Sequence, residues 1–123
     1  MDNMTEQEQQ LQQVGLDIDE AKAHIALAEA LDRLHKNADF KAVILKEYLI
    51  EESVRIVGLK SDPNALDEEK QTQIDNVIIS IGGLRQYFGK IYHMGRGSQQ
   101  AIDEYRGTQA ELLQEQLDGE SLQ

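Results

Sequence analysis

Apolar residues recur every seven positions through most of the stretch from Asp67 to Arg106. Three apolar side chains follow this interval from Ile74, and three more follow it from Val77. This repeat is the pattern by which one helix packs along another at a shallow angle. The residues predicted to form this helix–helix interface are Ile74, Val77, Ile81, Leu84, Phe88 and Ile91. We therefore expect a long helix whose apolar edge is covered by other helices.

The stretch 38–60 is apolar on more than one face, which is typical of a helix packed between neighbours. One of its apolar rows contains Val43, Ile50, Val54 and Val57. Pro63 follows, and a proline disfavours helical geometry in the residue before it, so we expect a turn there. Short links between helices usually make antiparallel neighbours. The pattern thus predicts an elongated antiparallel helical hairpin formed by 38–60 and 67–106 or beyond.

A shorter helix is expected at about 17–36, packed on this hairpin. Asp17 and Glu20 have the spacing of a capping box, in which both side chains bond free amides at a helix start. The two ends of the chain have few apolar anchors and are expected to be mobile. The predicted organisation is a mobile arm at 1–15, a single helical domain at 16–106 and an acidic, partly helical tail at 107–123. The predicted fold class is all-α.

The long helix contains glycines, each of which destabilises a helix interior by about 0.5–1 kcal/mol relative to alanine. Gly82 and Gly89 are seven residues apart and directly follow interface residues. They predict a groove where a second backbone, from this chain or another copy, lies close. The alternative is local flexibility, and the pair Gly95 and Gly97 favours a weak point in the helix.

Charge is concentrated at the ends of the chain. The net charge is −11, of which residues 1–36 carry −5 and residues 101–123 carry another −5. Bare DNA and anionic membranes are poor partners for such ends, because like charges repel. The chain has no cysteine, which excludes disulfides and thiolate metal sites. We expect neither a signal peptide nor a membrane span, because no apolar run is long enough.

No catalytic constellation is evident, so we expect no enzyme activity, cofactor or metal. The three histidines, His24, His35 and His93, are scattered and form no two-histidine metal motif. A modest basic patch remains, with tyrosines interleaved. Its members are Arg85, Lys90, His93 and Arg96. It is either a docking patch, for the acidic tails of sister subunits or another acidic partner, or a solvated helix face.

Several short blocks follow one another along the chain, namely Leu34, residues 37–41, Tyr48, Glu51, Glu52, Arg55, residues 60–63, residues 81–88 and Gly95. In this order they resemble small helical proteins of tailed bacteriophages that are encoded near capsid and portal genes. The resemblance covers about residues 30–105 and carries no catalytic residue across. It implies a part in virion structure or assembly.

These observations predict a phage structural or virion-assembly protein that acts through helix–helix contacts. Its expected partners are further copies of itself and other virion proteins. Its expected location is the host cytoplasm during assembly, or the virion. Two other classes stay open. One is an acidic inhibitor that binds a host nucleic-acid enzyme, and the other is a small helical metal protein or enzyme.

Overall fold

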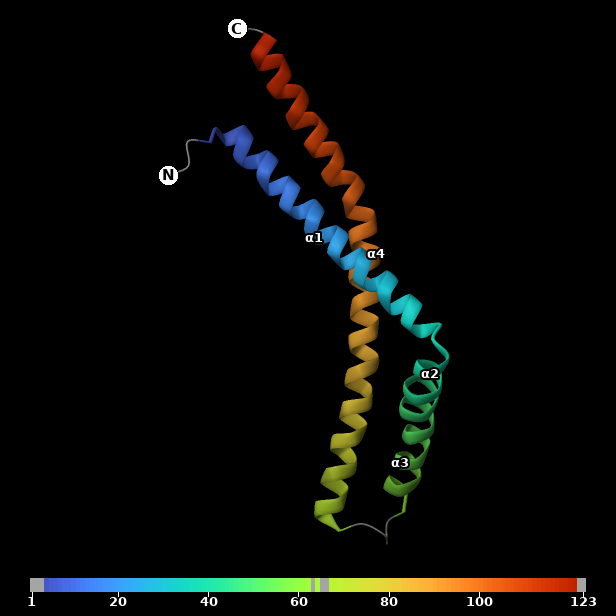
Figure 1. The fold of residues 1–123 in the computed structure, drawn as a ribbon. Coiled ribbons are helices and arrows are strands. Elements are labelled where there is room, and N and C mark those ends of the chain that lie inside the picture. Colours follow the sequence, from blue (N-terminus) through green and yellow to red (C-terminus); the bar gives the residue numbers. More distant parts are fainter. Residues whose placement is uncertain (1–3, 63, 65–66, 122–123) are drawn as a thin grey trace. The chain divides into compact units, whose positions relative to one another are not determined.

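The computed structural model describes residues 4–62, 64 and 67–121, and these residues are helical apart from short links (Figure 1). The elements are α1 (Glu6–His35), α2 (Ala38–Phe40), the π-helix η1 (Lys41–Glu51), α3 (Glu52–Lys60) and α4 (Glu68–Ser121). The described residues contain no strand, which confirms the all-α class. The long C-terminal helix α4 packs on the N-terminal helix α1.

Contacts divide the chain into two compact units. The terminal unit combines residues Met1–Ala28 with Tyr92–Gln123, and the central unit is Glu29–Ile91. Helices α1 and α4 each contribute one part to both units. The single domain expected over 16–106 stays a prediction.

Helix α1 begins at Glu6, much earlier than the expected start near Asp17. Thr5 caps it, because its hydroxyl accepts a hydrogen bond of 3.1 Å from the backbone N–H of Glu8. Thr5 and Glu8 have the spacing of a capping box, so the sequence did contain this signal. The expected cap at Asp17 is wrong, since Asp17 lies inside the helix.

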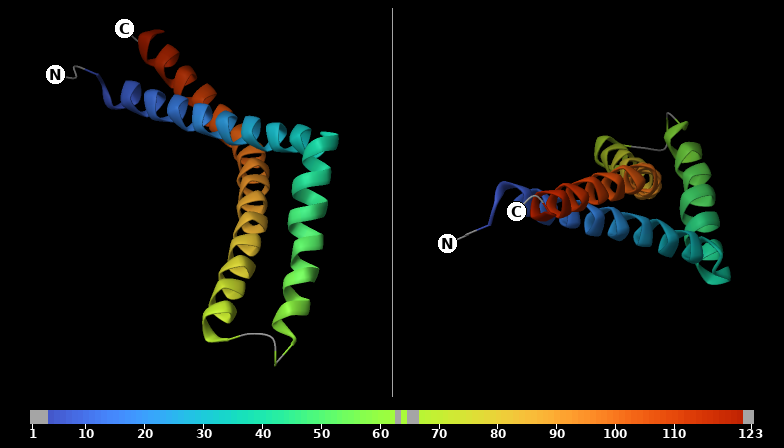
Figure 2. Two further views of the ribbon diagram at one scale, coloured as in Figure 1. Left: turned by 60° about the horizontal axis from the view of Figure 1, so that its bottom comes forward. Right: turned by 90° about the horizontal axis from the view of Figure 1, so that it is seen from above.

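In the terminal unit, the first part of α1 runs antiparallel to the last part of α4 (Figure 2). The side-chain amide of Gln7 donates to the backbone carbonyl of Leu112 at 3.0 Å. Closer to the other end of the unit, His24 contacts Ser98. The buried apolar side chains of this unit are Ile18, Ala21, Ile102 and Leu112. Residues 6–15 of the expected arm and residues 107–121 of the expected tail lie in helices α1 and α4.

In the central unit, η1 and α3 pack on the first part of α4. The Lys60 ammonium lies 2.7 Å from a carboxylate oxygen of Asp75. The Arg85 guanidinium donates to the backbone carbonyl of Leu49. Phe40 and Phe88 have ring centroids 6.0 Å apart.

The π-helix η1 changes which side chains share a face. Its hydrogen bonds span five residues, as in the bond from the Glu52 N–H to the Glu47 carbonyl. Val43 consequently lies over Tyr48, and both line one shallow groove. The expected row that joined Val43 to Ile50 assumed the α-helical repeat and is wrong at this point.

Side chains cap the helices that begin on either side of η1 and α3. The Asn37 side chain accepts from the Phe40 N–H at 3.0 Å, and Asp67 accepts from the Lys70 N–H at 2.8 Å. Asp62 accepts from the Asn64 N–H at 3.1 Å in the link between α3 and α4. Pro63, expected to stop the preceding helix, lies outside the described residues.

Helix α4 is 54 residues long and ends at Ser121, in line with the prediction of a helix that reaches residue 106 or beyond. It continues without interruption through Gly95 and Gly97, so the weak point expected there is not a break. The backbone at both glycines has the negative φ of an ordinary helix. The helix is held in this region by packing against α1, which compensates for the poor helix propensity of glycine.

Candidate functional site

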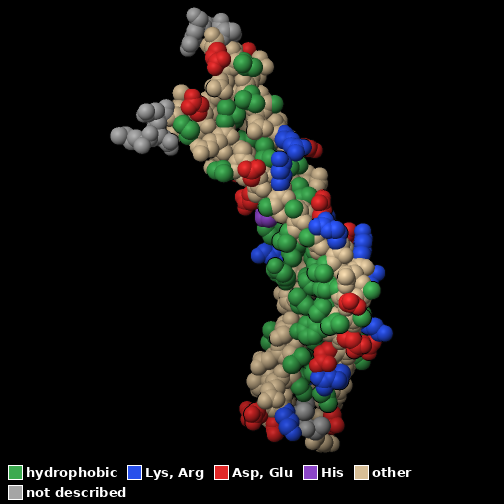
Figure 3. Space-filling view, in the orientation of Figure 1, with side chains coloured by type: hydrophobic (Ala, Val, Ile, Leu, Met, Phe, Trp, Pro, Cys, Tyr) green, Lys and Arg blue, Asp and Glu red, His purple; other side chains and the backbone are tan. Residues whose placement is uncertain are grey.

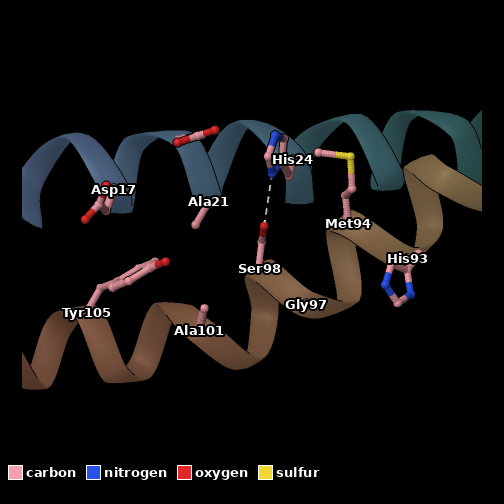
Figure 4. A pocket seen from close by; sticks show the side chains of 10 residues that line it. Asp17, Ala21, His24, His93, Met94, Gly97, Ser98, Ala101 and Tyr105 are labelled. Carbon is pink, nitrogen blue, oxygen red and sulfur yellow. Dashed lines mark hydrogen bonds between the residues drawn. The ribbon is translucent and has the colours of Figure 1, made fainter.

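A pocket of about 340 Å³ lies between α1 and α4 in the terminal unit (Figure 4). Small residues from the two helices, Ala21, Gly97 and Ala101, form part of its lining. The Tyr105 ring lies between the helices, and His93 points away from α1. The remaining lining residues are Asp17, Glu20, His24, Met94 and Ser98. The small side chains on both helices leave this space beside the Tyr105 ring.

A hydrogen bond of 3.2 Å joins His24 Nδ1 and Ser98 Oγ at this pocket. A serine beside a histidine is the starting arrangement for nucleophilic catalysis. Acyl transfer also needs N–H donors aimed at the developing oxyanion. Ser98 lies inside α4, where backbone N–H groups already donate to carbonyls four residues earlier. The hydrogen bond therefore joins α1 to α4 at this point of the terminal unit, and the backbone N–H groups around Ser98 are already used within the helix.

Gly95 is the glycine at which two helices come closest. A Cβ atom added there would lie 2.5 Å from Ala28 Cβ, well inside normal contact distance. The sequence pattern predicted the close approach at Gly82 and Gly89 instead, but nothing lies within 4 Å of a Cβ atom added at either position. Within the chain that choice is wrong, while a close approach by another copy stays a prediction. The small residues Ala21 and Ala28 on α1 were the signal that could have identified Gly95.

The predicted interface residues of α4 are covered by the chain itself. Ile74, Ile81 and Ile91 are 7%, 4% and 7% exposed, which leaves them little surface for another molecule. Val77, Leu84 and Phe88 are half-buried. The His35 ring lies edge-on to Phe88 and to Phe40, with centroid distances of 5.3 and 5.5 Å. The seven-residue repeat thus marks an internal packing surface.

The predicted docking patch falls in both units. Arg85 and Lys90 belong to the central unit, and His93 and Arg96 to the terminal unit. The Arg85 guanidinium is engaged with the Leu49 carbonyl, so it contributes to the fold. All four side chains are exposed. A single surface formed by the four residues stays a prediction.

Large apolar side chains are exposed mainly in the central unit, and Figure 3 shows them gathered over η1, α3 and the adjoining part of α4. The members on η1 and α3 are Val43, Ile50, Val54, Val57 and Leu59. Those on the other helices of this unit are Leu34, Ile78, Ile79 and Tyr87. Exposed apolar clusters of this kind mark interaction surfaces in soluble proteins.

An ion pair beside this apolar surface has a clear electrostatic effect. Arg55 donates two hydrogen bonds to the Glu52 carboxylate, at 2.9 and 2.5 Å. These hydrogen bonds hold the pKa of the Glu52 carboxyl below its ordinary value, and they raise the pKa of Arg55. The pair is solvated, so it contributes little to stability.

Comparison with known protein families, with curated proteins and with solved structures finds no match to this chain. In the part of the chain that the structure describes, no helix is long and apolar enough to cross a membrane. Among the same residues, no group of three histidine, aspartate or glutamate side chains is placed to hold a metal ion. The class that the fold defines is an all-helical protein.

Proposed function

We propose that this chain is a structural or assembly protein of a tailed bacteriophage and that it acts through helix–helix contacts with further copies and with other virion proteins. The observation that carries the proposal is the exposed apolar surface of the central unit. Val54, Val57 and Ile79 are 65%, 58% and 69% exposed there. The sequence blocks that resemble phage proteins lie mainly in the same unit and add support.

The finer architecture proposed for the central unit is an elongated antiparallel helical hairpin. The contacts Lys60–Asp75, Arg85–Leu49 and Phe40–Phe88 support this arrangement. A two-layer hairpin covers one side of each helix and leaves the opposite side to solvent or to partners. An assembly protein can use such open faces for reversible contacts with its neighbours.

The test is mass spectrometry of purified phage particles beside assemblies stalled before DNA packaging. We expect peptides of this chain in many copies in at least one of these preparations. Deleting the gene should then reduce the yield of complete particles. Absence of the chain from both preparations, with normal particle yield from the deletion, would exclude a structural or assembly role.

A second function, an acidic inhibitor of a host nucleic-acid enzyme, gains support from one observation. The terminal unit carries three basic and twelve acidic side chains, a net −9, and most of them lie on the paired helices α1 and α4. Acidic groups held on helices imitate the charge of a phosphate backbone better than acidic groups on loose tails.

The two functions predict different binding behaviour. An inhibitor should bind a host polymerase or nuclease, and DNA should compete with it. Replacing Glu111, Glu115 and Asp118 by the matching amides should weaken that binding, while the same variant should still enter phage assemblies under the structural function. Purified host RNA polymerase is the first enzyme to test, by calorimetry at low and high salt.

A further inference from the structure

One end of the pocket between α1 and α4 carries a carboxylate and an aromatic ring. Asp17 on α1 lies opposite the Tyr105 ring on α4, and the Tyr105 hydroxyl points toward the middle of the pocket (Figure 4). Both side chains are half-buried. The Asp17 Oδ1 atom accepts a hydrogen bond of 3.1 Å from the Gln13 amide, and a carboxylate can accept about four such bonds. Acceptor capacity therefore remains at this end, beside the ring.

The middle of the pocket is apolar and short. Ala21 and Ala101 point toward each other across it, and the hydrogen bond between His24 and Ser98 marks the other end (Figure 4). Every lining residue belongs to the terminal unit, so the pocket lies within one compact unit. Its volume of about 340 Å³ is near the lower end of the range of roughly 300–1,000 Å³ for small-molecule sites. The space therefore suits a ligand of a few non-hydrogen atoms.

Charge favours an organic cation as that ligand. Among the described residues that line the pocket, the charged side chains are the carboxylates Asp17 and Glu20, and none is a lysine or an arginine. The terminal unit has a net charge of −9, and a cleft lined by one sign of charge concentrates ions of the other sign. An aromatic ring also attracts a cation over its face. A metal ion is disfavoured, because no group of three metal-binding side chains is placed to hold one in the part of the chain that the structure describes.

We propose that this pocket binds a small primary aliphatic amine in its protonated form. The ammonium group lies between the Asp17 carboxylate and the Tyr105 ring, and its three N–H groups supply hydrogen bonds to the carboxylate and to the phenol oxygen. The alkyl chain lies between Ala21 and Ala101. Such a ligand touches both helices and stabilises the terminal unit, since it binds the folded chain alone. The site goes beyond the proposed role in phage assembly and does not depend on it.

The first test is an NMR titration of the full chain with n-butylammonium chloride. Saturable shifts should appear at the backbone amides of the pocket residues on both helices. The neutral analogue 1-butanol has the same alkyl chain without the charge and should bind about tenfold more weakly. Absence of saturable shifts with n-butylammonium, or equal binding of the alcohol, would overturn the proposal.

A matched pair of charge substitutions tests the carboxylate. Asp17→Asn should weaken n-butylammonium binding about tenfold, because the amide keeps the shape of the side chain but loses its charge. Asp103→Asn is the control, since Asp103 is exposed on α4 of the same unit and does not line the pocket. It should change binding less than about twofold, because solvent and salt screen its charge. Equal weakening by both substitutions would reveal general attraction to the acidic unit and would overturn the site.

Removal of the ring tests the other side of the ammonium position. Tyr105→Leu keeps an apolar side chain but removes the ring face and the hydroxyl, so it should weaken binding about fivefold or more. Tyr87→Leu, on an exposed tyrosine of the central unit, should leave binding unchanged. Unchanged binding in Tyr105→Leu would overturn the placement of the ammonium group beside this ring.

A filled pocket should exclude the ligand. Ala101→Leu places a larger side chain in the apolar middle of the pocket, and leucine keeps a high helix propensity. Ala110→Leu, at an exposed position of the same helix, is the control and should bind n-butylammonium as the wild type does. Circular dichroism checks that both variants stay helical. Full binding by a helical Ala101→Leu variant would overturn the pocket as the site, and if that variant does not fold, the comparison of Asp17→Asn with Asp103→Asn decides.

Discussion

The terminal and central units are built from parts of the same two long helices, yet their chemistry differs. The terminal unit has a net charge of −9, and its helices meet through small residues such as Gly95 and Ala28. The central unit has a net charge of −2, and its core consists of branched apolar side chains and aromatic rings. Helix pairing is therefore achieved in two ways, by close backbone approach in one unit and by side-chain volume in the other.

The surfaces of the two units differ as well, in exposed apolar side chains and in charge. Most of the exposed large apolar side chains belong to the central unit, whereas like charge accumulates on the terminal unit. Apolar contact with a second copy is favourable where charges balance and unfavourable where they repel. The exposed apolar side chains thus belong mainly to the central unit, and the excess acidic charge belongs to the terminal unit.

The largest expected effect is loss of core volume in the central unit. Ile81→Ala should reduce the free energy of unfolding by about 2–5 kcal/mol, because Ile81 is 4% exposed and its removal leaves a cavity. Ile79→Ala is the control, and at 69% exposure it should change stability by less than about 0.5 kcal/mol. Urea unfolding followed by circular dichroism measures both values. Similar losses for the two variants would mean that the repeat does not mark a core.

A smaller effect is expected from glycine substitution, and its sign should differ between the units. Gly95→Ala brings two Cβ atoms to 2.5 Å, and such overpacking destabilises by about 1–3 kcal/mol, more than the gain in helix propensity. Gly89→Ala has open space and should stabilise the chain by about 0.5–1 kcal/mol. Amide hydrogen exchange in α1 and α4 measures where each change acts.

A second substitution tests whether the loss of stability in Gly95→Ala comes from crowding against the Ala28 side chain. Ala28→Gly removes the atom that a new side chain at position 95 would meet. In the Gly95→Ala background it should recover stability in spite of the lower helix propensity of glycine. Further destabilisation in the double variant would contradict close backbone approach as the device that joins the helices of the terminal unit.

The helical class and the caps were predictable from local signals. Asn37 and Asp67, both residue types that favour the N-cap position, cap their helices, and such a cap depends on only a few neighbouring residues. The seven-residue repeat likewise identified the helix edge that became buried at Ile74, Ile81 and Ile91. The sequence did not identify the helix that covers this edge, because a repeat does not reveal whether the partner helix belongs to the same chain.

Other features depend on pairs of residues far apart in sequence and could not be read locally. Gly95 is special only because Ala28 lies against it, and Gly82 has the same local appearance without a neighbour. Residues 6–15 have few apolar side chains, yet they are helical beside Leu112, and that contact is more than one hundred positions away. The π-helical repeat of η1 also escaped prediction, because hydrophobic rows were assigned with an α-helical period.

The smallest expected effect concerns pH, and it belongs to the central unit. The pKa of Glu52 is lowered in the folded chain by its hydrogen bonds with Arg55, so the resulting stability is present at neutral pH and is lost as the pH falls through the lowered pKa. Carboxyl carbon shifts in an NMR titration measure Glu52 directly, and Arg55→Ala should raise its pKa toward the ordinary value. Lys60→Ala, which removes a different ion pair of the same unit, should leave the Glu52 titration unchanged. An unchanged Glu52 titration in Arg55→Ala would mean that the hydrogen bonds between the two side chains form too rarely in solution to lower the pKa of Glu52.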